Sequence, residues 1–201
     1  MRGDWQHLDQ VGFTRRSYRS YDDYVTHQRS KLAVGDFRDI DEALMRSLVF
    51  RLRGEDWRGK RVLCLAARLG GDIRAFLEMG ASAVGVDLEP GAHNRYVVTG
   101  DFHALQVGDA TVDVVYTNSL DHALEVEKVA AEVLRVLVPG GRFLVDATPG
   151  RADAAPSHWE AVIWETTEHL VAAIEEVEFK LGDRSAIEAP WEGTQLIFLS
   201  A

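Results

Sequence analysis

The pattern of apolar and polar positions divides the chain into two regions. Residues 1–56 are polar and aromatic, with helical spacing over 21–32 and 39–53 and no strand-like apolar run. In the rest of the chain, short apolar runs alternate with amphipathic segments. We therefore predict an N-terminal helical cap or lid over 1–56 and one compact domain over 57–201.

The second region predicts an α/β fold. Its apolar runs predict parallel strands at 61–65, 82–87, 95–101, 112–118 and 142–148. Its amphipathic segments predict helices at 71–80, 121–137 and 158–176. The last two runs, 177–181 and 194–200, are expected to form an antiparallel pair. Such alternation builds a mostly parallel sheet with helices on both faces.

Ligands of such sheets bind at the carboxyl ends of the strands. The first predicted strand is followed by a small-residue turn, and the second is followed by Asp87 and Leu88, 21 residues beyond Ala66. That separation is typical of a carboxylate that holds a ribose diol. The remaining candidates at these two strand ends are Ala67, Arg68 and Gly70.

The next two strand ends offer further polar groups. Asp101 and Phe102 could accept from an adenine amino group and cover the base. The fourth strand is followed by Asn118, Ser119, Asp121 and His122. Each of these residues also has a structural interpretation. Asp87 suits a turn in Asp-Leu-Glu-Pro-Gly, Asp101 suits a turn after Gly100, Asp121 could cap a helix, and His122 could simply pack.

The composition of the chain argues against some classes of binding partner. A net charge of −10 argues against nucleic acid or an anionic membrane surface as the main partner, while small anionic ligands remain open. Apolar residues make up 46% and charged residues 27%, and Cys64 is the only cysteine, which excludes an internal disulfide. We predict no metal. The chain shows no apolar targeting segment, so a cytoplasmic location is expected.

Residues 60–148 resemble the class I S-adenosylmethionine-dependent methyltransferases. The segments that carry the likeness are VLCLAARLGG, AVGVDLEPG and GDFHALQVGDATVDVVYTNSLDHALEVEKVAAEVLRVLVPGGRFLVD, and the last looks like the small-molecule branch. The resemblance implies a Rossmann-like, seven-stranded sheet with an antiparallel last strand. It also implies that the turn wraps the methionine part of the cofactor, Asp87 takes the ribose, Asp101 and Phe102 take the adenine, and Asn118 and Ser119 lie near the sulfonium.

The turn departs from the family pattern of an acidic residue and three alternating glycines. Cys64 stands at the acidic position, Ala66 and Arg68 stand at the first two glycines, and Gly70 remains. Alanine is expected to fit where φ stays negative. Arg68 either turns its guanidinium toward the cofactor carboxylate, which we favour, or fills the pocket.

Methyl transfer mainly requires that the acceptor be positioned, with a base for its proton. His122 is the first candidate for that base, and Asp121 could orient it or serve instead. In the N-terminal region, cations alternate with tyrosines, which suits an anionic or planar acceptor; a solvated helical face is the alternative. The predicted substrate residues are Arg15, Arg16, Tyr18, Tyr21, Tyr24 and His27.

The predicted function is therefore methyl transfer from S-adenosylmethionine, leaving S-adenosylhomocysteine, to a small molecule such as a sugar, a nucleotide-sugar or a secondary-metabolite intermediate. The alternative is a protein of the same fold that binds the cofactor or another ligand without methyl transfer, either as a different enzyme or as a partner subunit. A nicotinamide-dependent oxidoreductase is disfavoured, because neither G-x-G-x-x-G nor a Tyr-x-x-x-Lys pair is present.

Overall fold

The computed structural model describes residues 5–7, 12–150 and 157–200. Within them, the main sheet has seven strands in the order β5-β4-β3-β6-β7-β10-β9. The parallel strands are β3 (Arg61–Leu65), β4 (Ser82–Asp87), β5 (Val97–Thr99), β6 (Val112–Thr117) and β7 (Leu137–Ala147). Strand β10 (Gly193–Leu199) runs antiparallel to both β7 and β9 (Lys180–Ile187). The predicted parallel sheet with an antiparallel last strand is confirmed.

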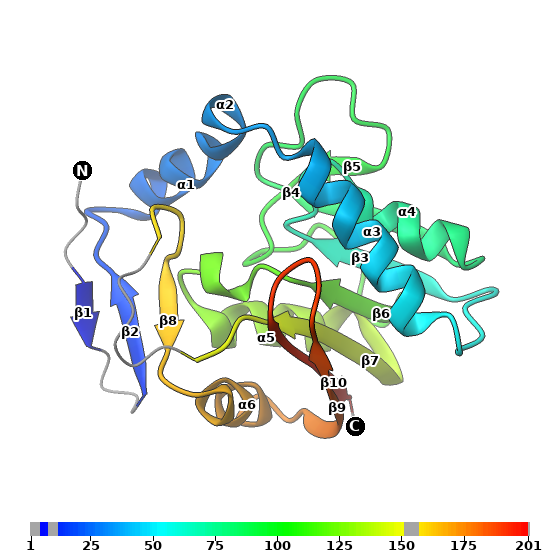
Figure 1. Cartoon of the computed structure of the whole chain (residues 1–201). Helices are drawn as coiled ribbons and strands as arrows, with labels where there is room; N and C mark the ends of the chain where they lie inside the picture. Colours follow the sequence, from blue (N-terminus) through cyan, green and yellow to red (C-terminus); the bar gives the residue numbers. More distant parts are fainter. Residues whose placement is uncertain (1–4, 8–11, 151–156, 201) are drawn as a thin grey trace.

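Helices cover both faces of this sheet (Figure 1). Helices α3 (Arg38–Leu52) and α4 (Gly71–Glu78) pack on one face, and α5 (Val126–Val136) and α6 (Thr167–Glu175) pack on the other. The apolar side chains of α3 recur every four residues at Leu44, Leu48 and Leu52, and all three are buried. This spacing puts them on one face of the helix and explains why α3 docks on the sheet.

Two of the predicted helices are wrong in part. The segment 121–137 is a short 3-10 turn, η1 (Leu120–His122), followed by α5, and Leu137 already belongs to β7. The Pro-Gly-Gly sequence that follows cannot continue a helix. The segment 158–176 contains strand β8 (Val162–Trp164), since a β-branched and aromatic run suits a strand. Its helix α6 begins only after Thr166, whose side chain accepts from the His169 N–H.

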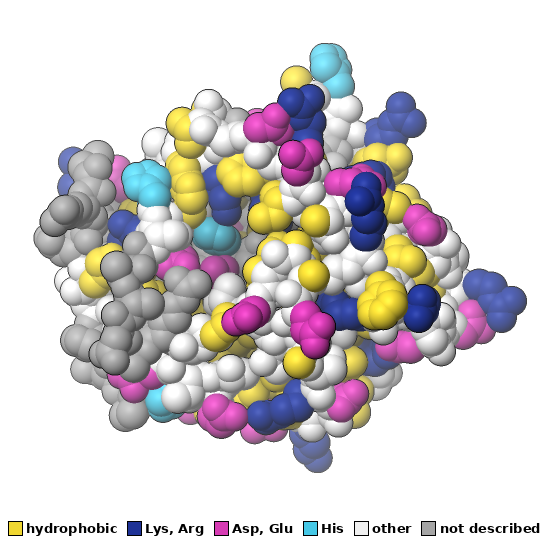
Figure 2. Space-filling view, in the orientation of Figure 1, with side chains coloured by type: hydrophobic (Ala, Val, Ile, Leu, Met, Phe, Trp, Pro, Cys, Tyr) yellow, Lys and Arg dark blue, Asp and Glu magenta, His cyan; other side chains and the backbone are white. Residues whose placement is uncertain are grey.

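The N-terminal region contains two short strands that the sequence did not predict. Strands β1 (Trp5–His7) and β2 (Phe13–Arg16) form a small antiparallel sheet with β8, in the order β1-β2-β8. Helices α1 (Tyr21–Arg29) and α2 (Lys31–Val34) follow, and Figure 1 shows them leading from this small sheet toward α3. On the face shown in Figure 2, acidic and basic side chains are interspersed.

Candidate active site

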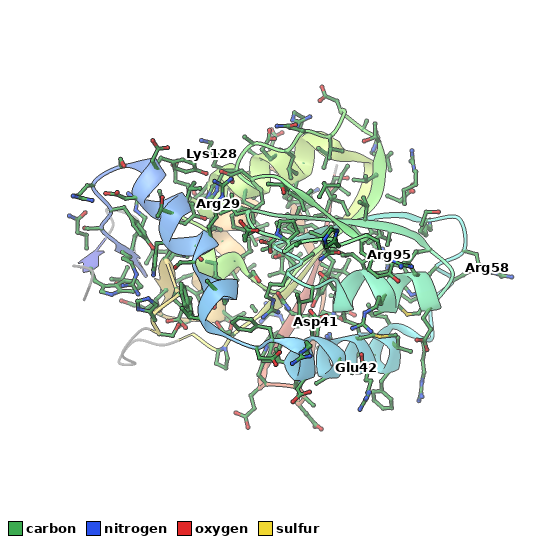
Figure 3. All side chains as sticks on the ribbon, turned by 90° about the horizontal axis from the view of Figure 1, so that it is seen from above. Arg29, Asp41, Glu42, Arg58, Arg95 and Lys128 are labelled. Atoms are coloured by element: carbon green, nitrogen blue, oxygen red, sulfur yellow. The ribbon has the colours of Figure 1, made fainter. Side chains whose placement is uncertain are left out.

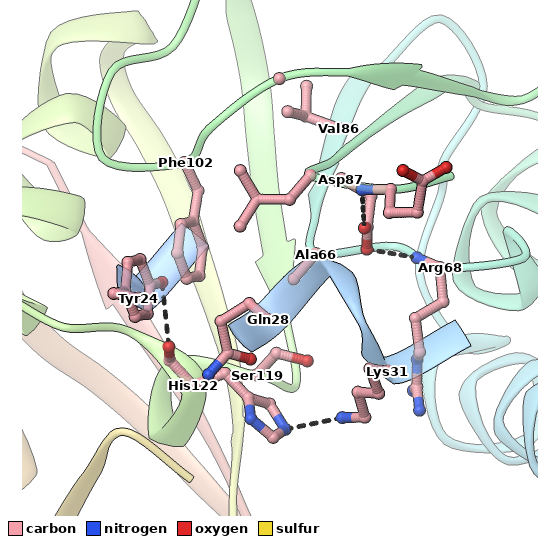
Figure 4. Close-up of a pocket in the computed structure, with 13 residues that line it drawn as sticks. Tyr24, Gln28, Lys31, Ala66, Arg68, Val86, Asp87, Phe102, Ser119 and His122 are labelled. Carbon is pink, nitrogen blue, oxygen red and sulfur yellow. Dashed lines mark hydrogen bonds between the residues drawn. The ribbon is translucent and has the colours of Figure 1, made fainter. Parts of the chain in front are cut away.

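One pocket lies where the carboxyl ends of β3, β4, β5 and β6 meet α1 and α2 (Figure 4). It encloses about 560 Å³, including its open mouth. Of the residues predicted for the site, those that line it are Tyr24, Ala66, Arg68, Asp87, Leu88, Phe102, Ser119 and His122. The folded chain thus brings together candidates from four strand ends that are far apart in sequence.

The turn after β3 keeps a left-handed backbone although two of its residues are not glycine. The φ angles are 52° at Ala66, 44° at Arg68 and 90° at Gly70. The expectation that alanine fits here with a negative φ is therefore wrong. Each non-glycine residue in this region costs about 1–2 kcal/mol. Residue 71 must be small for another reason, because a Cβ on Gly71 would lie 2.2 Å from the Asp41 carbonyl oxygen of α3.

Asp87 holds the turn and the following loop at the rim of the pocket. Its Oδ2 accepts from the Arg68 N–H at 2.9 Å, and its Oδ1 accepts from the Glu89 N–H at 2.8 Å (Figure 4). A carboxylate has about four acceptor positions, so these two bonds leave capacity for a ligand. Asp87 therefore has a structural role and can still serve the predicted ribose role.

Asp101 and Phe102, predicted to bind the adenine together, have different surroundings in the structure. Phe102 lines the pocket, whereas Asp101 lies beside it and binds groups of the protein. The Asp101 carboxylate accepts from Tyr21 Oη at 2.5 Å and from both the N–H and Nδ1 of His103 at 2.9 Å. Although burial opposes ionisation, the hydrogen bonds from His103 and Tyr21 hold the pKa of Asp101 below its ordinary value. Its predicted adenine role stays a prediction, in competition with these partners.

Two buried donors near the pocket lack an acceptor among the described residues. They are Nε of Arg68 and Nδ2 of Asn118. The Asn118 side chain is held through its other atom, since Ser119 Oγ donates to Asn118 Oδ1 at 2.7 Å. Because an unpaired buried donor is costly, these groups favour a ligand that brings acceptors.

Both ring nitrogens of His122 are in use. Nδ1 lies 2.8 Å from the Trp159 carbonyl oxygen, and Nε2 lies 3.0 Å from Nζ of Lys31 (Figure 4). Burial lowers the pKa of His122, although Asp121 opposes this shift. The Asp121 Oδ1 atom is 3.9 Å from His122 Nε2, so the two predicted catalytic residues are near neighbours without a hydrogen bond.

Most of the predicted substrate residues bind other parts of the protein. Tyr24 lines the pocket and donates to the His122 carbonyl at 3.0 Å. Arg16 is buried and donates to the carbonyls of Glu160 and Ser157, and Arg15 donates to Leu124 O. Tyr18 Oη lies 2.8 Å from Nδ1 of His27, and burial is the main cause that lowers the pKa of His27 to about 4. Tyr21 binds Asp101, as described above.

Gln28 and Lys31 also line the pocket, although neither is among the predicted substrate residues. Lys31 is one of the cations that alternate with tyrosines in the N-terminal region. The Gln28 amide donates to the Trp159 carbonyl at 2.9 Å. The available signal was the spacing of Tyr24, Gln28 and Lys31 at i, i+4 and i+7, which places all three on one side of a helical segment. Together they form the wall opposite the strand ends.

Behind the turn, Arg68 faces a second group of buried charges. Its guanidinium lies 5.9 Å from the Phe37 ring centre. Burial raises the pKa of both Asp41 and Asp72, and the positive charge of Arg68 opposes both shifts. The pKa of Asp72 still rises to about 7. Burial raises the pKa of the Cys64 thiol, and the neighbouring Asp72 carboxyl raises it further. A carboxyl group from α4 thus lies against the position where the family pattern has its acidic residue.

Helix α3 closes this side of the turn. Arg74 of α4 donates to Glu42 Oε2 at 2.9 Å and to Asp41 Oδ2 at 3.4 Å. Figure 3 shows Asp41 and Glu42 at the start of α3.

Among the residues the structure describes, no group of three or more His, Cys, Asp or Glu is placed to hold a metal ion. None of the helices in these parts of the chain is long and apolar enough to cross a bilayer.

The chain is similar in sequence to known methyltransferases. Residues 63–145 match the family model described as a methyltransferase domain. Over 124 residues, the chain is 33% identical to 24-methylenesterol C-methyltransferase 2 of Oryza sativa subsp. japonica, a match that covers 52% of this chain and 34% of the relative. The chain thus spans about a third of the length of the curated relative it matches.

Solved structures share the fold along most of the chain. The 1,6-didemethyltoxoflavin-N1-methyltransferase of Burkholderia thailandensis, solved with 1,6-didemethyltoxoflavin and S-adenosylhomocysteine, superimposes with a TM-score of 0.75 at 22% identity, covering 97% of this chain and 98% of that one. A Haloferax volcanii putative methyltransferase in complex with the Trm112 activator gives 0.69 at 18% identity, covering 87% and 97%. The predicted Rossmann-like class I methyltransferase fold is confirmed.

Proposed function

We propose that this chain transfers a methyl group from S-adenosylmethionine to a small-molecule acceptor, because residues 63–145 match a methyltransferase-domain family model and the fold is that of the class I methyltransferases. The observation that carries the proposal is that a single pocket joins the ends of β3, β4, β5 and β6. This is the place where sheets of this type bind their ligands.

The residues of the pocket fit the cofactor. Asp87 retains acceptor capacity for the ribose hydroxyls, and Phe102 offers an apolar wall for the adenine. The unpartnered Nε of Arg68 suits the carboxylate of the methionine part, because guanidinium and carboxylate form strong charge-assisted bonds. The left-handed turn keeps the backbone conformation that glycines would give there. When bound, the cofactor would supply an activated methyl group.

The chain's own residues would then position the acceptor against that methyl group. The wall formed by Tyr24, Gln28 and Lys31 lines the pocket beside η1, so the acceptor would be held near this wall. A sugar, a nucleotide-sugar or a secondary-metabolite intermediate is the proposed acceptor class. The sterol and toxoflavin activities named for the relatives support a small molecule.

Calorimetric titration with S-adenosylmethionine and S-adenosylhomocysteine tests the proposal. We expect micromolar binding in the native chain and a loss of about tenfold or more in Asp87→Ala, which removes a charged acceptor. Asp113→Ala is the matched control, since Asp113 pairs with Arg61 at the opposite end of the sheet. A native chain that binds neither ligand would sink the proposal.

The altered turn is the reason to keep a second candidate, a protein of this fold that binds the cofactor without transferring its methyl group. Ala66 and Arg68 replace the first two glycines of the family pattern. Binding of S-adenosylmethionine without methylation of any compound in a broad acceptor screen, followed by mass spectrometry, would favour this alternative.

A further inference from the structure

The amine of Lys31 occupies a specific place between the pocket and His122. Its Nζ lies 3.0 Å from His122 Nε2 and 5.7 Å from the centre of the Phe37 ring. The side chain projects from the start of α2 toward the pocket beside Arg68 (Figure 4). Lys31 is thus a pocket-lining amine whose direction is set by an imidazole.

The hydrogen bonds of His122 decide whether His122 or Lys31 can act as the base. The Trp159 carbonyl can only accept, so the proton of a neutral His122 is on Nδ1. His122 Nε2 is then an acceptor and takes its hydrogen bond from Lys31. Both ring nitrogens of His122 are thus hydrogen-bonded, and no lone pair of the ring is free to take a proton from the methyl acceptor. A neutral Lys31 amine still has its lone pair.

We propose that Lys31 is the catalytic residue that receives the proton of the methyl acceptor, and that His122 is a positioning residue which holds the Lys31 amine. This inference rests on the proposed function. It replaces His122 as the first candidate for the base and assigns a class of acceptor, namely a weak acid with an ionisable O–H or N–H group, such as a phenol, an enol or a heteroaromatic N–H.

The step balances without any further reactant. The oxygen or nitrogen of the acceptor forms a bond to the methyl carbon, and the carbon–sulfur bond breaks with its electron pair remaining on sulfur. The acceptor's proton moves to the Lys31 lone pair, which gives an ammonium group. That ammonium keeps its hydrogen bond to His122 and returns its proton to water after the product leaves.

The charges around Lys31 suit this role. Burial is the main cause that lowers the pKa of Lys31 to about 8, and the positive charge of Arg68 lowers it further. The groups that oppose the shift are Asp121 of η1, Asp87 at the end of β4, and Glu160 before β8. An amine with this pKa is partly neutral near neutral pH, unlike an ordinary lysine at about 10.4. The matching acceptor is an acid of similar strength.

The first measurement is the titration of Lys31 in the S-adenosylhomocysteine complex, followed by NMR of ¹³C-labelled lysine Cε and assigned with Lys31→Met. We expect one lysine to titrate near pH 8. Titration of Lys31 at the ordinary lysine value would overturn the proposal. His122→Phe should leave a lysine with lowered pKa, since burial is the main cause, but should broaden or shift its signal as the amine loses its fixed partner.

The second measurement uses para-nitrophenol as the probe acid, because its phenolate and phenol absorb at different wavelengths. At a pH about one unit below the probe's own pKa, about one-tenth of the free probe is phenolate, and the complex should raise the phenolate fraction of bound probe to about one half, which is a lowering of the probe's pKa by about one unit. Lys31→Met should abolish the increase. Lys60→Met is the control, since Lys60 is exposed just before β3, at the opposite end of the sheet.

Each remaining outcome is decisive. Phenolate that forms equally in Lys31→Met, or a complex that does not ionise saturating probe, contradicts the proposal. The ionisation of the probe in Lys31→Met is measured at saturating S-adenosylhomocysteine, so that a change in cofactor affinity does not alter the result. Loss of cofactor binding by the native chain would be a failure of the proposed function, whereas intact binding with an ordinary Lys31 would be a failure of this inference alone.

Discussion

Two polar clusters lie among the central strands and at their carboxyl ends, and they differ in how completely their groups are partnered. The Asp146 cluster joins α3, β6, β7 and β10 through Arg51, Tyr116, Asp146 and Gln195. Four donor groups, at distances of 2.5 to 3.1 Å, share the two carboxylate oxygens of Asp146. The pocket cluster consists of Lys31, Arg68, Asn118 and His122, and it contains donors without acceptors.

The difference separates a cluster that serves the fold from one that is built for a ligand. Asp146 is 1% exposed and leaves none of its partners unpaired, so nothing remains for a ligand to satisfy. In the pocket cluster, Arg68 Nε and Asn118 Nδ2 are buried without partners among the described residues, beside an open pocket. Buried donors of this kind cost free energy unless a ligand supplies acceptors.

The largest expected effect on stability comes from a substitution in the Asp146 cluster. Asp146→Ala should lower the free energy of unfolding in urea by about 3–5 kcal/mol, because it leaves the buried Arg51 guanidinium without its counter-ion. The double variant Arg51→Met with Asp146→Leu should recover most of that loss, since neither charge remains. Asp56→Ala, which removes an exposed pair with Arg58, should cause no measurable change. An equally small effect of Asp146→Ala would contradict a structural role for the cluster.

Asp72 offers a second contrast, because it is a buried carboxyl without a direct cation. Its raised folded-state pKa of about 7 lies above the value of about 3.9 in an unfolded chain, so the folded state binds the extra proton between these values. The contribution of Asp72 to stability should therefore fall as pH rises through that window, by about 1.4 kcal/mol per pH unit. His27 and His122, whose pKa values are lowered, contribute the opposite slope in the same range. The difference in free energy of unfolding between the native chain and Asp72→Asn, measured by urea titration from pH 4 to 8, should therefore fall with this slope.

Asp113→Asn is the control for this pH dependence. The Asp113 carboxylate accepts from Arg61, which lowers its pKa, so it titrates below the window. Equal pH slopes in the native chain and in Asp72→Asn would show that Asp72 is ionised in the folded protein throughout the window.

The sequence predicted the sheet because its strands are short apolar runs bounded by turns, and such runs are local signals. It misassigned Val162–Trp164, because that strand is stabilised by pairing with the distant β2. Asp87, Phe102 and Ser119 could be found because they follow strands directly. Lys31 could not be assigned in the same way, since its place in the pocket depends on how α1 and α2 dock.

The pocket cluster can be probed through Arg68. Arg68→Met should weaken S-adenosylhomocysteine binding by about ten- to a hundredfold, if its guanidinium binds the ligand carboxylate as proposed. Arg95→Met removes the same charge from an exposed position (labelled in Figure 3) and should leave the affinity unchanged in calorimetry. Equal affinities in both variants would assign the Arg68 charge to Asp41 and Asp72 instead.

The smallest effect concerns the backbone of the turn. Ala66 has a φ of 52°, which costs an alanine about 1–2 kcal/mol, whereas glycine adopts it freely at an entropic cost of about 0.5–1 kcal/mol. Ala66→Gly should therefore raise the free energy of unfolding by about 0.5–1 kcal/mol. The neighbouring Ala67 is buried and has no left-handed φ, so Ala67→Gly should lower it. Urea unfolding measures both changes. A gain in stability in Ala66→Gly together with a loss in Ala67→Gly would establish that Ala66 is held in a left-handed conformation that glycine prefers. Changes of the same sign in both variants would contradict it.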